Sequence, residues 1–134
     1  MGDVCRMLQG PIATRALQVL ADYERAANAL LTEGPASQAY PQGSRLFEDL
    51  QGLASDLPHA RVAWVEVLIS RFEFTHALWT AGSGHAARDS ARSLGLVHLA
   101  ALARFREKCR IAYLSPGAIS VRPATAPDDP PLLA

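Results

Sequence analysis

The sequence RVAWVEVLISRFEFTHALW, residues 61–79, decides the fold. At 100° per residue, its apolar side chains cover most of the circumference of a helix. One broad face holds Val62, Val65, Leu68, Ile69, Phe72, His76 and Trp79. The opposite side holds Trp64, Val67, Phe74 and Leu78, and a narrow polar strip holds Glu66, Ser70 and Glu73. A helix of this kind is typical of the interior of a bundle, so we expect other elements to contact it on several sides and to bury its broad face as well.

Three further helices are predicted around this central one. Residues 12–32 have a clear amphipathic period that ends at Gly34-Pro35, and Gly10-Pro11 is expected to separate them from residues 1–10. Residues 35–43 are predicted to be a loop, with Ser44 as the N-cap of a short helix that ends before Pro58. The last helix is predicted over about residues 85–113. The fold class is therefore an all-α, single-domain helical bundle of three long helices plus one short helix.

The C-terminal segment differs in composition from the rest of the chain. Residues 115–134 contain five of the nine prolines and have no helical period. We therefore expect a helical bundle domain over residues 1–114, followed by an irregular, flexible, Pro-rich tail over residues 115–134.

Composition limits the kinds of partner. Hydrophobic residues make up 49% of the 134 residues and charged residues only 19%. A small chain with this much apolar surface is expected to bury some of it against a protein partner or a second copy. The formal net charge of zero argues against a strong overall field for nucleic acid or anionic lipid.

The expected setting is the cytoplasm. Cys5 and Cys109 are too few and too far apart in sequence for a disulfide framework. The first residues contain no apolar run long enough for a signal peptide, and no stretch of 18 uncharged apolar residues predicts a membrane span.

Two histidines interrupt apolar helix faces. His76 lies in the broad face of the central helix and His98 in the apolar face of the last one, so both are candidate buried polar residues. If the two helices are antiparallel, the imidazoles can face each other and bind a metal or a haem iron. Two ligands without a third do not make a zinc site, and Glu73, three residues before His76, has no matching glutamate before His98. A hydrogen-bonded core role is therefore preferred, with no cofactor and no metal.

Arginines form the clearest polar feature outside the predicted core. Arg88, Arg92, Arg106 and Arg110 fall within about 40° of one another on a helical wheel of the last helix. Such a line of arginines can meet acidic residues of the same chain, a protein partner, or a phosphate backbone. No aromatic side chain that would stack on bases accompanies it, so nucleic acid is the less favoured partner.

No pair of residues has the spacing that acid–base, nucleophilic or metal chemistry requires, so we predict no catalytic residues and no enzyme. The preferred hypothesis is a non-enzymatic interaction or structural subunit that homo-oligomerises or docks into a larger assembly. The first alternative is a helical subunit that binds a nucleic-acid backbone through the arginine line. The second is a metal- or haem-binding bundle using His76 and His98.

Overall fold

The computed structural model describes the backbone of residues 2–80 and 85–114, and the side chains of residues 10–80 and 88–111. The described chain forms four α-helices and one short 3-10 turn, with no strand within those ranges. The elements are α1 (Gly2–Glu33), α2 (Ala39–Ala54), η1 (Pro58–Ala60), α3 (Arg61–Thr80) and α4 (His85–Leu114). The predicted all-α helical bundle is confirmed.

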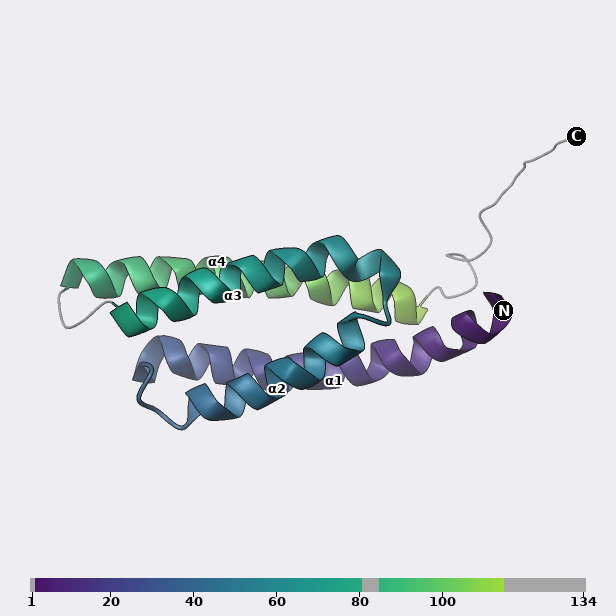
Figure 1. Cartoon of the computed structure of the whole chain (residues 1–134), viewed down its shortest axis with the longest axis horizontal. Coiled ribbons are helices and arrows are strands. Elements are labelled where there is room, and N and C mark those ends of the chain that lie inside the picture. The colour runs from purple at the N-terminus through teal and green to yellow at the C-terminus, as the bar shows by residue number, and fades with distance from the viewer. Residues whose placement is uncertain (1, 81–84, 115–134) are drawn as a thin grey trace, which may run out of the picture.

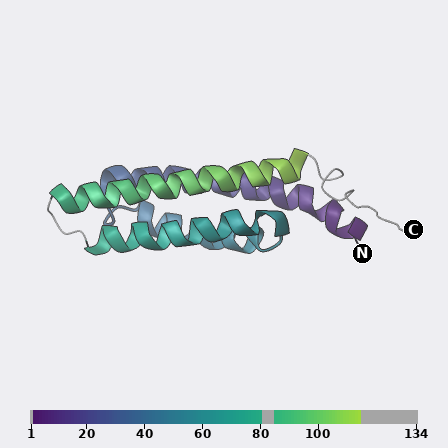
Figure 2. The same cartoon turned by 90° about the horizontal axis from the view of Figure 1, so that it is seen from above.

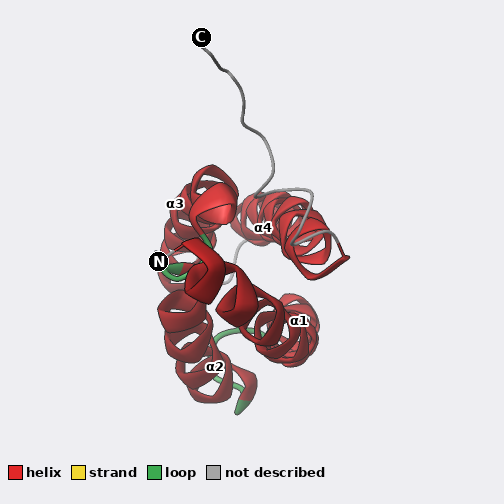
Figure 3. Cartoon of the chain, turned by 90° about the vertical axis from the view of Figure 1, so that its right-hand side faces the viewer, coloured by secondary structure: helices red, strands yellow, loops and turns green. Residues whose placement is uncertain are grey.

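The helices form two antiparallel hairpins that pack side by side. α1 and α2 make one hairpin and α3 and α4 the other, so successive helices run in opposite directions (Figure 1). The view from above shows α4 beside α1 along the length of the bundle, with the N-terminal end of α1 projecting beyond it (Figure 2). Viewed along the bundle, each helix occupies one corner, and α3 lies next to α2 and α4 (Figure 3). The topology is that of an up-down-up-down four-helix bundle.

The predicted apolar faces of the first and last helices are buried. Ala16, Leu20 and Tyr23 of α1 and Ala101 and Phe105 of α4 have at most 3% of their surface exposed. The short helix contributes Phe47 and Leu50 to the same core, and Leu57 closes it before η1. Because these faces follow the 3.6-residue period, the sequence pattern identified them correctly.

Two helix boundaries differ from the prediction. α1 continues through Gly10-Pro11, where the Thr14 hydroxyl donates to the Gly10 carbonyl at 2.9 Å. α2 begins at Ala39 instead of near Ser44, so part of the predicted loop is helical. Pro41 is tolerated there because the first backbone N–H groups of a helix have no partner within it.

The orientation of α3 contradicts the prediction from its broad face. The side that packs into the bundle consists of Ala63, Trp64, Val67, Ser70 and Phe74. Apart from Leu68, which is partly buried against the core, the broad face instead points outward, with Val62 76% and Phe72 71% exposed. The expectation that the broad face is buried was wrong, because both sides of α3 are apolar and periodicity alone cannot choose between them.

Two further predictions concern the C-terminal tail and the absence of a membrane span. The tail over residues 115–134 lies outside the described residues. Among the described helices, none combines the length and apolar character needed for a membrane span.

A substitution at Gly95 of α4 tests how closely this helix packs against α1 and α3. A Cβ at this position would lie 2.4 Å from Leu31 Cδ2 and 2.7 Å from Phe74 Cε1. The Phe74 ring is 1% exposed, and both it and Leu31 would have to shift to admit the methyl group, so we expect Gly95→Ala to lower the free energy of unfolding by about 1–3 kcal/mol.

Gly52 is the matched control, because it is an exposed glycine of α2 and a Cβ placed on it would have no neighbouring side chain within 4 Å. Gly52→Ala should raise stability by roughly 0.5–1 kcal/mol through helix propensity alone. Urea denaturation measures both variants. Equal effects of the two substitutions would contradict the close packing of α4 against α1 and α3.

Candidate functional site

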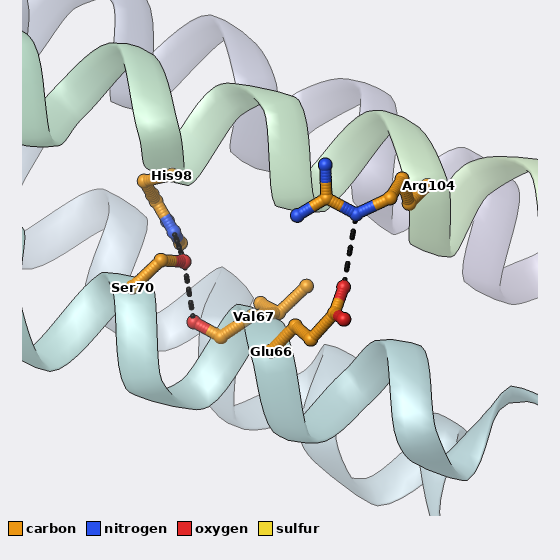
Figure 4. Close-up of polar contacts among 5 residues, drawn as sticks. All are labelled: Glu66, Val67, Ser70, His98 and Arg104. Atoms are coloured by element: carbon orange, nitrogen blue, oxygen red, sulfur yellow. Dashed lines mark hydrogen bonds and ion pairs between the residues drawn. The ribbon is translucent and has the colours of Figure 1, made fainter.

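His98 connects three helices through a chain of hydrogen bonds. The Tyr23 hydroxyl of α1 lies 2.8 Å from His98 Nε2, and the Ser70 hydroxyl of α3 lies 2.8 Å from His98 Nδ1. The Ser70 hydroxyl in turn donates to the Val67 carbonyl at 3.0 Å (Figure 4). His98 has no exposed surface and Ser70 only 5%. We call these four groups the His98 network.

The directions of these hydrogen bonds follow from counting protons. Ser70 has one hydroxyl proton, and it is used on the Val67 carbonyl, so Ser70 accepts from His98 Nδ1–H. His98 Nε2 is then the acceptor of the Tyr23 hydroxyl. We assign the Nδ1–H tautomer on this basis. Both ring nitrogens are satisfied within the chain, and no lone pair on them is left for a metal.

Burial keeps the His98 network uncharged. Desolvation, reinforced by the positive charge of Arg71, lowers the pKa of His98 to about 4. Desolvation raises the pKa of Tyr23 to about 12, against the opposing charge of Arg71. A neutral imidazole and a neutral phenol are the states that the hydrogen bonds require. The core role predicted for His98 fits this geometry.

His76 is not buried, contrary to the prediction. Its side chain is exposed on the outer side of α3, and its ring stacks on Phe72 with 6.0 Å between the ring centroids. His98 of α4 packs against the opposite side of α3, next to Ser70. The two imidazoles therefore do not meet, and the shared iron or metal site that required them to meet is excluded.

Cys109 and the described carboxylates do not form a reactive centre. Cys109 is free and fully buried, and desolvation raises the pKa of its thiol to about 12. A thiol with this pKa is a poor nucleophile at neutral pH. Within the described residues, no group of three or more His, Cys, Asp and Glu side chains is placed to hold a metal ion.

The arginine line is divided between different surroundings. Arg106 forms an ion pair with Glu24 of α1, whose side chain is only 16% exposed. Arg110 contacts Glu107, three residues earlier on α4, at 3.4 Å. Arg88 and Arg92 line a cavity of about 320 Å³ beside the end of α1. At least half of the predicted line is thus in contact with carboxylates of the same chain.

The most distinctive surface of the described molecule is the outward side of α3. We define the α3 outer face as Val62, Val65, Ile69, Phe72, His76 and Trp79. Its five apolar members are between 47% and 76% exposed. At one end of this face the Trp79 ring contacts Tyr40 of α2, with 5.4 Å between the ring centroids. Large apolar side chains contiguous on one helix are characteristic of a surface that another protein covers.

The α3 outer face has a regular spacing in the sequence. Its six positions are spaced 3, 4, 3, 4 and 3 residues apart, which is the a/d spacing of a coiled coil. The inward positions Ala63, Val67, Ser70 and Phe74 are spaced 4, 3 and 4 residues apart, so spacing alone does not distinguish the outward side of α3 from the inward one.

Comparison of the chain with protein-family models, curated proteins and solved structures finds no match. Function is therefore argued from the residues and their geometry.

The low pKa of His98 makes stability depend on pH. In the unfolded chain His98 binds a proton below about pH 6.5, whereas in the folded chain it does so only below about pH 4. The contribution of His98 to the free energy of unfolding is therefore fully present above pH 6.5. It is lost as the pH falls toward 4, by about 3 kcal/mol.

Urea unfolding of the wild type and of His98→Asn between pH 7 and pH 4 measures this loss, since all other titrating groups are common to both proteins. We expect the stability difference in favour of the wild type to shrink by about 3 kcal/mol over this range. A constant difference would show that His98 titrates normally in the folded protein.

Proposed function

We propose that the protein is a non-enzymatic helical subunit whose α3 outer face binds a protein partner, either a second copy or another member of a larger assembly. The exposure of the α3 outer face carries this proposal. Five large apolar side chains, on average more than half exposed, occupy consecutive turns of one helix. Burying a side chain of this size contributes about 1.5–3 kcal/mol, so covering the face provides a substantial driving force for association.

The chemistry of the polar residues supports a role without catalysis. His98 uses both ring nitrogens inside the core, and the Cys109 thiol is fully buried. A catalytic group must instead reach a substrate in a cleft. The free thiol also fits the reducing, cytoplasmic setting that we propose for the protein.

The phosphate-binding alternative has weaker support. It requires the four arginines to act as one charged line, but Arg106 is paired with Glu24 and Arg110 contacts Glu107. Each pairing reduces the positive charge available to a phosphate backbone.

Substitutions on the α3 outer face test the proposal. Ile69→Ser and Phe72→Ser remove large side chains that are 56% and 71% exposed, so the fold should keep its stability to within about 0.5 kcal/mol. Association should weaken at least tenfold, because the exposed part of these side chains would be buried only in the complex. The measurement is the native mass of the tagged chain in extracts of its own host cells.

Leu96→Ser is the matched control, since Leu96 is 51% exposed but lies on α4. This variant should keep the native mass of the wild type. If the tagged wild-type chain migrates in the extract as a monomer, at 14.4 kDa plus the mass of the tag, the proposed function is wrong.

A further inference from the structure

The α3 outer face has the spacing of side chains found in coiled coils. With Val62 as an a position, Ile69 and His76 are also a positions, and Val65, Phe72 and Trp79 are d positions. The β-branched residues at two of the three a positions are those of parallel two-stranded coiled coils, whereas the d positions hold Val, Phe and Trp in place of Leu. The six residues extend over about 27 Å of helix, so a second helix can contact all of them.

Charged residues border this face in a pattern that selects its partner. Arg61 is the g position before Val62, and Glu66 and Glu73 are the e positions on the other border. All three side chains are exposed. In a parallel pair, each g residue faces the e residue five positions later on the other helix. Arg61 of one copy then faces Glu66 of the other, and the symmetry gives this pair twice.

The antiparallel arrangement of the same two helices is disfavoured by its charges. Antiparallel packing places e positions of one helix opposite e positions of the other. Glu66 of one copy would then face Glu73 of the second copy, and two carboxylates would repel. The charges therefore favour the parallel arrangement. In register it forms two Arg61–Glu66 pairs, whereas a shift by one heptad leaves a single Arg61–Glu73 pair.

We propose that α3 packs against α3 of a second copy of this chain, parallel and in register, to form a twofold-symmetric homodimer. This inference rests on the proposed function and names the partner. A twofold axis along α3 brings the same face of both copies together, as an isologous interface requires. The corner position of α3 in the bundle leaves this side accessible (Figure 3).

The contacts of Glu66 within its own chain are compatible with the dimer. Glu66 Oε1 accepts from Arg104 Nε of α4 at 2.9 Å, and both side chains are about half exposed (Figure 4). The second carboxylate oxygen can accept from Arg61 of the other copy, because a carboxylate has four acceptor sites. Arg104 thereby orients Glu66 at the border of the interface.

His76 gives the dimer its register. As an a residue it meets His76 of the second copy, and one neutral imidazole can donate to the other. A polar residue at a single a position penalises arrangements that leave it opposite an apolar side chain. With the helices shifted by one heptad, His76 would face Ile69 and lose this hydrogen bond.

The area is sufficient for a stable dimer. At roughly 100 Å² of exposed surface on each of the six side chains, the pair buries about 1,200 Å², the lower bound of specific interfaces. α3 is already folded by its own bundle, so association does not have to form the helix.

A charge-exchange experiment tests the parallel pairing. In Arg61→Glu, two glutamates face each other at each border, and in Glu66→Lys an arginine faces a lysine. Each variant alone should dimerise about tenfold more weakly than the wild type. Mixed together, they should form a heterodimer in which both pairs are complementary, at more than the statistical half of all dimers. Native mass spectrometry and analytical ultracentrifugation of the purified full chains measure both quantities.

Glu73→Lys is the matched control, because it makes the same charge change at an e position whose parallel g partner is the uncharged Leu68. Mixed with Arg61→Glu, it should show no preference for the heterodimer. A tighter homodimer of Glu66→Lys or Glu73→Lys would identify an antiparallel pair and overturn the proposal.

The mass of the purified wild type separates this inference from the proposed function. A purified dimer that Phe72→Ser dissociates supports both. A purified monomer, even at 100-fold higher concentration than in the extract, overturns the homodimer. If the tagged chain in the extract is nevertheless part of a larger complex that Phe72→Ser disrupts, the proposed function stands with a different protein as partner.

Discussion

The bundle depends on one buried imidazole that must find a partner for each of its two nitrogens. His98 of α4 has no exposed surface, and its partners come from α1 and α3. An unsatisfied polar group at this depth would cost about 1–3 kcal/mol. The three helices are therefore fixed relative to one another by hydrogen bonds with defined lengths and directions. Apolar packing alone would tolerate small rotations of each helix, whereas this network does not.

The rotation of α3 about its own axis follows from the same requirement. Ser70 must point inward to accept from His98, and Trp64 must point toward the rings of Phe47 and Phe105. Once these two residues face the core, the 3.6-residue period places Val65, Phe72 and His76 on the opposite side. The exposure of the α3 outer face is thus a consequence of the core's polar network. A second helix that covered this face would leave the His98 network unchanged.

The sequence alone predicts the fold class and the buried faces of α1 and α4, because each of these helices has a clear polar side. It fails for α3, where a serine assigned to the polar strip is the residue that enters the core. Nothing in the period of residues 61–79 distinguishes Ser70 from Glu66 and Glu73; the distinction comes from the buried imidazole 28 residues later. His76 was misplaced for the same reason. Long-range pairs between polar side chains are invisible to periodicity.

The arginines of α4 and the α3 outer face differ in what they contact. On α4, Arg106 is held by a largely buried glutamate of α1, and Arg104 holds Glu66 at the border of the α3 outer face. Charge on this helix therefore joins the two hairpins and positions the carboxylates around the apolar surface. An apolar face can bind many partners weakly, and the fixed charges at its edges restrict which helix can lie there and in which direction. In this chain the sequence order of Arg61, Glu66 and Glu73 is self-complementary in a parallel pair of α3 helices, and this charge order supports the proposed homodimer.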